Sequence, residues 1–176
     1  MRRLALLAVA CLAATTGLVF GSARAQSDGA VAHRAPASPR PPAAVACALP
    51  TAYRSAFQAA ARATGLPVEM LLAVGEVESR LKQRARSAAG AEGVLQVLPS
   101  TARALRLDPT RARENVLAGA VYLRSLLRRF DSVDVALAAY NAGPTAVERA
   151  GGAPSGQSLT YVANVTARWR GLLRCR

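Results

Sequence analysis

The sequence predicts an all-α domain, on the evidence of three features. From Thr51 onward, apolar residues recur at spacings of three and four, which is the period of a helix with one buried face. No run of alternating β-branched residues indicates a strand. Glycine, proline and asparagine stand at the ends of the periodic segments, where helices usually start and stop. Each expected helix can therefore be placed in order along the chain.

The second predicted helix brings a glutamate to a buried face. Residues 53–63 form an Ala-rich helix, and Pro67 opens the next one at a position that tolerates proline. Leu71, Val74 and Glu78 share one face of that helix because their spacings are three and four. We therefore expect the Glu78 carboxyl group to be partly removed from water near the helix end.

The rest of the domain continues as helices and glycine-containing loops. Asn115 can cap a long amphipathic helix that reaches Phe130. The other expected elements are a loop over residues 87–93, a short helix after Pro99, a helix over 133–140 broken by residues 141–144, a loop over 151–156 and a final helix over 159–173.

The N-terminal part is typical of an exported protein. Two arginines precede an apolar run over residues 4–20, and an Ala-x-Ala site ends at Ala25. This pattern predicts a signal peptide over residues 1–25, and the run is short for the alternative, a membrane anchor. Residues 26–46 are rich in proline and alanine without apolar periodicity, which predicts a flexible linker. The folded domain is then expected over residues 47–176, with no stable membrane anchor after cleavage.

Two cysteines bracket the expected domain. Cys11 leaves with the signal peptide, and Cys47 and Cys175 remain. In an oxidising compartment such a pair favours a disulfide, the alternative being two free thiols near the termini. The signal peptide and the cysteine pair together predict a periplasmic or secreted bacterial protein.

The chain is strongly basic, with a formal net charge of +13. Loss of residues 1–25 removes three arginines and no acid, which leaves +10. Such a charge favours a polyanionic or acidic partner. Export and the spread of the arginines argue against nucleic acid, whereas a bacterial cell wall carries carboxylates and phosphates.

The residue inventory excludes several kinds of active site. The only histidine, His33, lies in the predicted linker. The domain therefore cannot build a Ser-His-Asp triad, a Cys-His pair or a His-ligated zinc site. Carboxylate chemistry remains, and burial of Glu78 would raise its pKa so that it could protonate a leaving oxygen, as glycosidic cleavage needs. The structural alternative is an ion pair with a nearby cation of residues 80–84.

Two further segments carry polar groups suited to a glycan. Gln96 follows a glycine and offers both a donor and an acceptor to a sugar. Tyr140 and Asn141 stand at a helix end before a glycine turn, which puts a phenol and an amide at one rim. Taken singly, each has a structural reading: a loop-edge glutamine, a core tyrosine and a capping asparagine.

In this order the segments resemble the catalytic domain of the lytic transglycosylases, the goose-type-lysozyme-like family of SLT type that cleaves bacterial peptidoglycan. The resemblance runs from about Tyr53 to Trp169. Its pieces are residues 72–79 with Glu78-Ser79, residues 87–102 with Gly93-Val94-Leu95-Gln96, residues 114–123, residues 136–144 with Tyr140-Asn141-Ala142-Gly143-Pro144, residues 151–152, and Tyr161-Val162.

The resemblance implies a lysozyme-like helical fold with a cleft, and an enzyme that needs no metal or cofactor. It implies cleavage of the β-1,4 bond between N-acetylmuramic acid and N-acetylglucosamine, with Glu78 as both acid and base and a 1,6-anhydro product. The residues it places along the substrate are Ser79, Gln96, Tyr140, Asn141 and Tyr161. The expected partners are peptidoglycan strands and, from the small size of the chain, an envelope-spanning secretion or other machine.

Two other functions stay open. A hydrolytic lysozyme would need a second carboxylate for its water, and Glu92 is the candidate. A non-catalytic glycan-binding component of an envelope machine would be marked by loss of the glutamate, and Glu78 is present.

Overall fold

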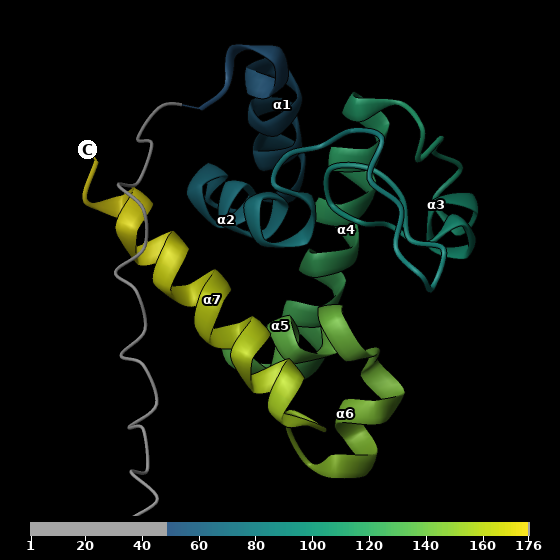
Figure 1. The fold of residues 1–176 in the computed structure, drawn as a ribbon, viewed down its shortest axis with the longest axis vertical. Coiled ribbons are helices and arrows are strands. Elements are labelled where there is room, and N and C mark those ends of the chain that lie inside the picture. Colours follow the sequence, from purple (N-terminus) through teal and green to yellow (C-terminus); the bar gives the residue numbers. More distant parts are fainter. Residues whose placement is uncertain (1–48, 176) are drawn as a thin grey trace, which may run out of the picture. The chain divides into compact units, whose positions relative to one another are not determined.

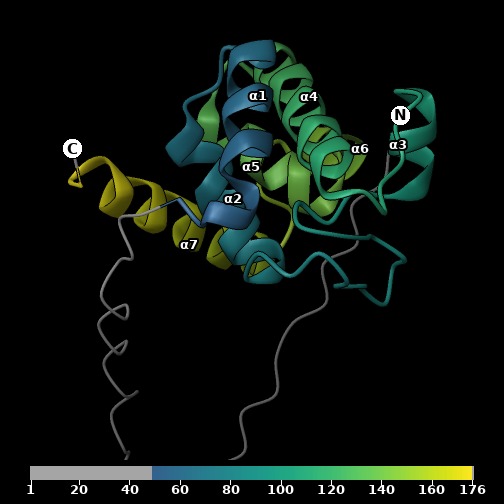
Figure 2. The same cartoon turned by 90° about the horizontal axis from the view of Figure 1, so that it is seen from above.

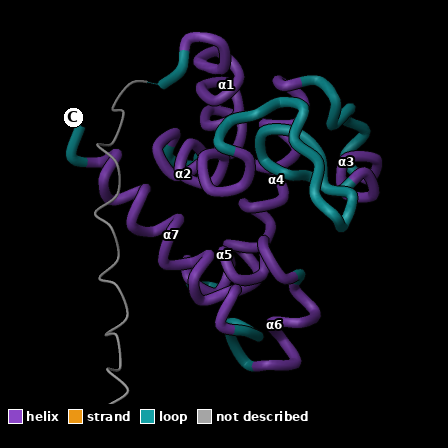
Figure 3. Tube along the Cα trace, in the orientation of Figure 1, coloured by secondary structure: helices purple, strands orange, loops and turns teal. Residues whose placement is uncertain are grey.

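Helices build residues 49–175, the part of the chain that this computed structural model describes (Figure 1). Loops connect them, and no strand forms within this part (Figure 3). The all-α prediction is confirmed. The elements are the 3-10 helix η1 (Thr51–Tyr53) and the helices α1 (Arg54–Thr64), α2 (Val68–Ser79), α3 (Pro99–Ala104), α4 (Ala112–Phe130), α5 (Val133–Ala142), α6 (Pro144–Ala150) and α7 (Gly156–Leu173). The predicted signal peptide and linker lie outside the described residues, as does Cys47, so these predictions and the bridge to Cys175 stay predictions.

Two helices organise the packing. The long helix α4 lies against α1 and α5, and α7 lies against α2 and α5 (Figures 1 and 2). Their contacts enclose a core whose largest fully buried apolar side chains are Phe57, Leu71, Leu95, Leu123 and Leu137. Because Leu95 belongs to the loop between α2 and α3, part of that loop is anchored in the core.

The end of α2 is an unusual turn. Arg80 and Leu81 both adopt left-handed backbone conformations, with φ of 53° and 59°. The Ser79 hydroxyl group donates to the carbonyl oxygen of Val94 at 2.8 Å and accepts from the backbone N–H of Lys82 at 3.1 Å. The Ser79 hydroxyl group therefore connects the end of α2 to the loop that follows it.

The structure corrects three element predictions. Asn115 does not cap α4: the helix begins at Ala112, and Asn115 lies fully buried in its first turn. A separate helix, α6, follows Gly143 directly, because proline at its first position is compatible with a helix start. The final helix begins at Gly156, since the Ser155 hydroxyl group caps it by accepting from the N–H of Ser158.

Candidate active site

The carboxyl group of Glu78 is hydrogen-bonded to the phenol of Tyr161, a residue of the last helix. Glu78 lies in the last turn of α2, and its Oε1 accepts a hydrogen bond of 2.7 Å from the hydroxyl group of Tyr161. Tyr161 comes from the buried face of α7. The close packing of α2 and α7 thus brings together two of the residues singled out in the sequence.

Burial dominates the ionisation of Glu78. It raises the pKa from 4.5 to about 7, and the hydrogen bond from Tyr161 opposes this rise without cancelling it. None of the ion pairs among residues 49–175 involves Glu78, so the expected alternative of a salt bridge with Arg80, Lys82 or Arg84 is not what forms. The result is a carboxyl group that holds a proton close to neutral pH.

Tyr140 joins α5 to the loop beside Glu78. Its hydroxyl group donates to the carbonyl oxygen of Leu95 at 2.8 Å, and its ring lies 5.4 Å from the ring of Tyr122. Burial, together with the nearby charge of Glu78, raises the pKa of Tyr140 well above its usual value. The phenol therefore stays protonated and holds the loop in place.

Asn115, which was expected to cap a helix and lies in a segment of the family resemblance, instead supports the loops beside the site. Its Oδ1 accepts from the N–H of Leu95 at 2.8 Å, and its Nδ2 donates to the carbonyl oxygens of Glu92 at 2.8 Å and Pro109 at 3.1 Å. The spacing of four from Asn115 to Gly119 and on to Leu123 was a sequence signal for a buried position. One amide side chain thus fixes two loops.

Gly93 and Gln96 have the backbone conformations that the loop between α2 and α3 needs in order to pack against Asn115. A Cβ atom on Gly93 would lie 2.4 Å from Asn115 Nδ2, and the φ of Gly93 is +76°, so only glycine fits. Gln96 is itself left-handed, with φ of 45°. Its Nε2 donates to the carbonyl oxygens of Gly93 at 2.9 Å and Ala85 at 3.2 Å. The amide nitrogen is therefore engaged in the loop.

A pocket of about 200 Å³ lies between this loop and the end of α5. Its lining consists of Gln96, Val97, Leu98, Thr101, Tyr122, Tyr140, Asn141, Ala142 and Gly143. Asn141 is exposed there, and its Oδ1 accepts from the Ser158 hydroxyl group at 3.4 Å. Three of the predicted site residues, Gln96, Tyr140 and Asn141, share this pocket, whereas Ser79 is buried and bonded to backbone.

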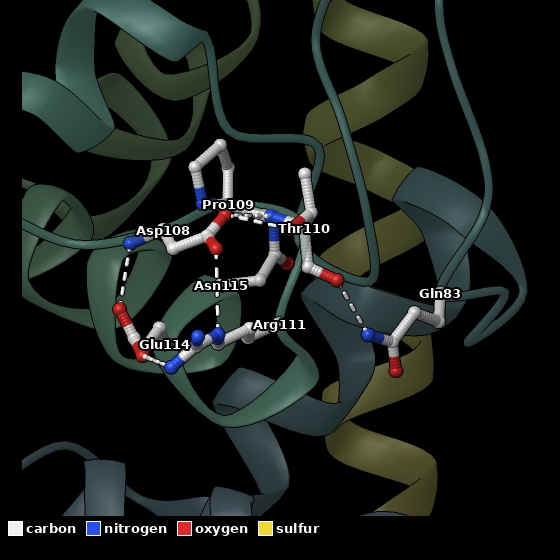
Figure 4. Close-up of polar contacts among 7 residues, drawn as sticks. All are labelled: Gln83, Asp108, Pro109, Thr110, Arg111, Glu114 and Asn115. Atoms are coloured by element: carbon white, nitrogen blue, oxygen red, sulfur yellow. Dashed lines mark hydrogen bonds and ion pairs between the residues drawn. The ribbon is translucent and has the colours of Figure 1, made fainter.

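Glu92 belongs to a different and larger pocket of about 610 Å³. It forms an ion pair of 2.9 Å with Arg86, which lines the same pocket. Gln83 spans the pocket's two loops by donating to the carbonyl oxygen of Thr110 at 2.7 Å (Figure 4). Figure 4 also shows Asn115 reaching Pro109 in the same loop. Glu78, which contacts Tyr161, and Glu92, which is paired with Arg86, therefore lie in different environments.

Two further properties of residues 49–175 concern metal binding and membrane insertion. No group of three histidine, cysteine, aspartate or glutamate side chains is placed to hold a metal ion there. Nor does that part of the chain contain a helix with the length and apolar character of a membrane span.

Residues 55–160 match the family described as the Transglycosylase SLT domain. The transglycosylase of Enterobacteria phage PRD1 is 36% identical over 89 residues, which cover 48% of this chain and 32% of that protein. Membrane-bound lytic murein transglycosylase F of Thiobacillus denitrificans is 35% identical over 105 residues, with coverages of 55% and 22%. The chain thus spans a third or less of the length of these relatives.

A solved structure gives a similar result for the fold. The X-ray structure of an inactive mutant of the lytic transglycosylase Slt from Pseudomonas aeruginosa superimposes with a TM-score of 0.60 at 28% identity. The match covers 68% of this chain and 24% of that one. In that mutant a glutamine replaces a glutamate.

Proposed function

Because the chain belongs to the Transglycosylase SLT domain family, we propose that it is a peptidoglycan lytic transglycosylase that cleaves the β-1,4 bond between N-acetylmuramic acid and N-acetylglucosamine. The observation that carries this proposal is the partly buried Glu78 carboxyl group, whose pKa is raised to about 7 and whose partner is the Tyr161 phenol. A carboxyl group that keeps its proton near neutral pH can donate it to a leaving oxygen. That is the first requirement of glycosidic cleavage.

Glu78 acts twice in the proposed reaction. It first protonates the glycosidic oxygen as the bond from that oxygen to the anomeric carbon breaks. The resulting carboxylate then takes the proton of the sugar's own 6-hydroxyl group while that oxygen bonds to the anomeric carbon, which gives the 1,6-anhydro product and returns Glu78 to its protonated form. Tyr161 donates its hydrogen bond to the carboxylate between the two proton transfers, when the charge is greatest.

Of the other site residues, some are assigned to contact with the glycan and others to support of the loop between α2 and α3. We assign Gln96 and Asn141 to the glycan, because both line the 200 Å³ pocket and Asn141 is exposed in it. Tyr140 lines the pocket with its ring and holds the loop with its hydroxyl group. Ser79 acts through the loop, since its hydroxyl group is bonded to backbone.

The surroundings of Glu92 favour the transglycosylase over a hydrolytic lysozyme. A hydrolase that uses two carboxylates needs both of them at the scissile bond. Glu92 lines the larger pocket and is paired with Arg86, whereas Glu78 lines neither that pocket nor the 200 Å³ pocket and accepts a hydrogen bond from Tyr161. An intramolecular hydroxyl nucleophile needs no second carboxylate.

The cellular location and the partners of the protein follow from the same proposal. A peptidoglycan substrate places the enzyme in the periplasm or outside the cell, in agreement with the predicted signal peptide. An oxidised Cys47–Cys175 pair belongs to this setting, and an envelope-spanning machine is the proposed protein partner. The positive charge of the chain complements the carboxylates of the wall.

Mass spectrometry of the material released from purified peptidoglycan tests the proposal. The wild-type protein should release fragments with 1,6-anhydro ends, and Glu78→Gln should release none. Fragments with reducing ends would establish a hydrolase instead. A folded wild-type protein that binds peptidoglycan but releases nothing would establish a glycan-binding component.

A further inference from the structure

A partly buried ion pair joins α2 to α7 close to Glu78. Arg168 Nη2 donates to Glu76 Oε1 at 2.6 Å, and Arg168 Nε donates to Glu76 Oε2, so the contact uses both oxygens. The Arg168 side chain is only 18% exposed, and the Glu76 side chain is 21% exposed. In every other ion pair among the described residues the arginine is at least 49% exposed.

Arg168 occupies a position where an apolar residue is expected. Tyr161, Val165, Arg168 and Leu172 share one face of α7 by spacings of four and three, and the other three are buried. A desolvated ion pair usually adds little net stability, because the cost of removing both charges from water offsets their attraction. What a two-point arginine–carboxylate contact supplies is a fixed relative geometry.

That geometry concerns the contact between Tyr161 and Glu78. Two polar side-chain contacts join α2 and α7 among the described residues, one at Glu78 and the other at Glu76. Tyr161 and Arg168 are two turns apart, about 10.5 Å along α7. A slide of α7 by one turn, about 5.4 Å, would take the Tyr161 hydroxyl group out of hydrogen-bond reach of Glu78. The two-point contact at Glu76 opposes such a slide.

We propose that Glu76 and Arg168 form a positioning pair that fixes the register of α7 on α2 and so keeps the Tyr161 hydroxyl group on Glu78. The inference rests on the proposed function, because the Tyr161 hydrogen bond that the pair maintains stabilises the negative charge on Glu78 between the two proton transfers. Neither residue lines the pocket assigned to the glycan. Loss of the pair should therefore lower kcat and leave KM nearly unchanged.

Substitution of Arg168 alone would both remove the contact and leave the Glu76 carboxylate unpaired. The titratable groups that face Glu78 are Tyr161 from α7 and Tyr140 from α5. Removal of Arg168 alone would add an uncompensated carboxylate at Glu76, two residues from Glu78, and this would perturb the proton affinity of Glu78 directly. Replacement of both partners removes the tether without leaving a charge behind.

The test is the double variant Glu76→Leu with Arg168→Met. Its matched control is Glu148→Leu with Arg129→Met, which removes the exposed pair of 2.6 Å between α6 and α4. We expect the first variant to melt within a few degrees of wild type and to lose about tenfold in kcat, with KM within about twofold. The control should keep the wild-type kcat. Arg168→Lys, which keeps the charge without the two-pronged contact, should give an intermediate kcat.

A second readout needs no substrate. The carboxyl group of Glu78, followed by carbon NMR with pH, should titrate at a higher pH in the Glu76→Leu/Arg168→Met variant, because the hydrogen bond from Tyr161 lowers its pKa. The control variant should titrate as wild type does. If wild type proves inactive on peptidoglycan while this shift appears, the proposed function falls and the positioning role stands.

Two results would overturn the proposal. One is a folded Glu76→Leu/Arg168→Met variant with wild-type kcat and an unshifted Glu78 titration. The other is a failure of that variant to fold while the control folds, because the pair would then serve stability and not register.

Discussion

Glu78 and Glu92 show how two glutamates of one small domain come to differ. Glu78 lies partly buried at the end of α2 where α7 packs on it, and its partner is a neutral phenol at 2.7 Å. Glu92 lies on the loop after α2 at the edge of the larger pocket, and its partner is the exposed guanidinium of Arg86 at 2.9 Å.

The partner decides what each carboxyl group can do. A phenol donates a hydrogen bond but carries no positive charge, so burial still raises the pKa of Glu78 to about 7. A guanidinium compensates the charge of a carboxylate and leaves it a structural role. The difference shows that a carboxyl group keeps its proton close to neutral pH where no cation is paired with it, even in a chain with 23 lysines and arginines.

The strongest test of this contrast is Glu78→Gln. Glutamine keeps the size of the side chain and can accept from Tyr161, but it transfers no proton. We expect release of glycan fragments to fall by at least about 10³-fold, within the usual range for loss of a general acid. Circular dichroism should show an unchanged helical content. Turnover above a few per cent of wild type would remove Glu78 from the role of acid.

The pH dependence should follow the raised pKa of Glu78. The acid must be protonated, so kcat should fall about tenfold per pH unit above about 7. Stability should change in the same direction: the folded state holds the proton more tightly than the unfolded state, so this contribution is full below pH 4.5 and is lost as the pH rises through 7.

The full contribution is at most about 3.5 kcal/mol, because the pKa rises from 4.5 to about 7 and one pKa unit corresponds to about 1.4 kcal/mol. Urea titrations at pH 5 and pH 8 measure it. The loss between these two pH values should be smaller in Glu78→Gln than in wild type, and equal losses would contradict the assignment.

Tyr161→Phe should have a smaller effect on the rate. It removes one hydrogen bond to the carboxylate, which is worth about 1.5–3 kcal/mol for a charged acceptor, so we expect kcat to fall by about 10- to 150-fold. The pKa of Glu78 should rise further, and the alkaline limb of the pH profile should move upward with it. A profile that does not move would show that the phenol leaves the proton affinity of Glu78 unaffected.

Glu92→Gln should have the smallest effect. It removes the ion pair between the largely buried Glu92 side chain, which is 13% exposed, and Arg86, which is 72% exposed, so the guanidinium that loses its partner stays in water and the cost is about 1 kcal/mol. We expect activity within about threefold of wild type and a melting temperature within a few degrees. A loss as complete as that of Glu78→Gln would make Glu92 a second catalytic carboxylate and favour the hydrolase.

The helix spacing predicted part of this site. Leu71, Val74 and Glu78 share a face by local geometry, so the position of the carboxyl group near a buried helix end could be predicted. Local geometry could not predict that Tyr161 meets Glu78, because the two residues are joined only when α7 packs on α2. The resemblance to a known family supplied Tyr161 as a site residue, but it did not supply Arg168.

The loop between α2 and α3 was the hardest part to predict. Asn115 was expected to cap a helix because asparagine often does so. It instead enters the core and bonds to backbone from two loops, since Gly93 leaves room for it. The left-handed backbones of Leu81 and Gln96 have no sequence signal, because neither residue type favours that conformation.

The distance along the chain between Glu78 and Tyr161 also bears on the order of folding. Their hydrogen bond closes a separation of 83 residues, and the ion pair at Glu76 closes one of 92. Contacts of such long range form late, because the chain between them must be ordered first. A nascent chain that ends before α7 would carry the glutamate as an ordinary solvated side chain. The pairing of Glu78 with Tyr161 is thus acquired only when α7 docks on α2, after the rest of the domain has been made.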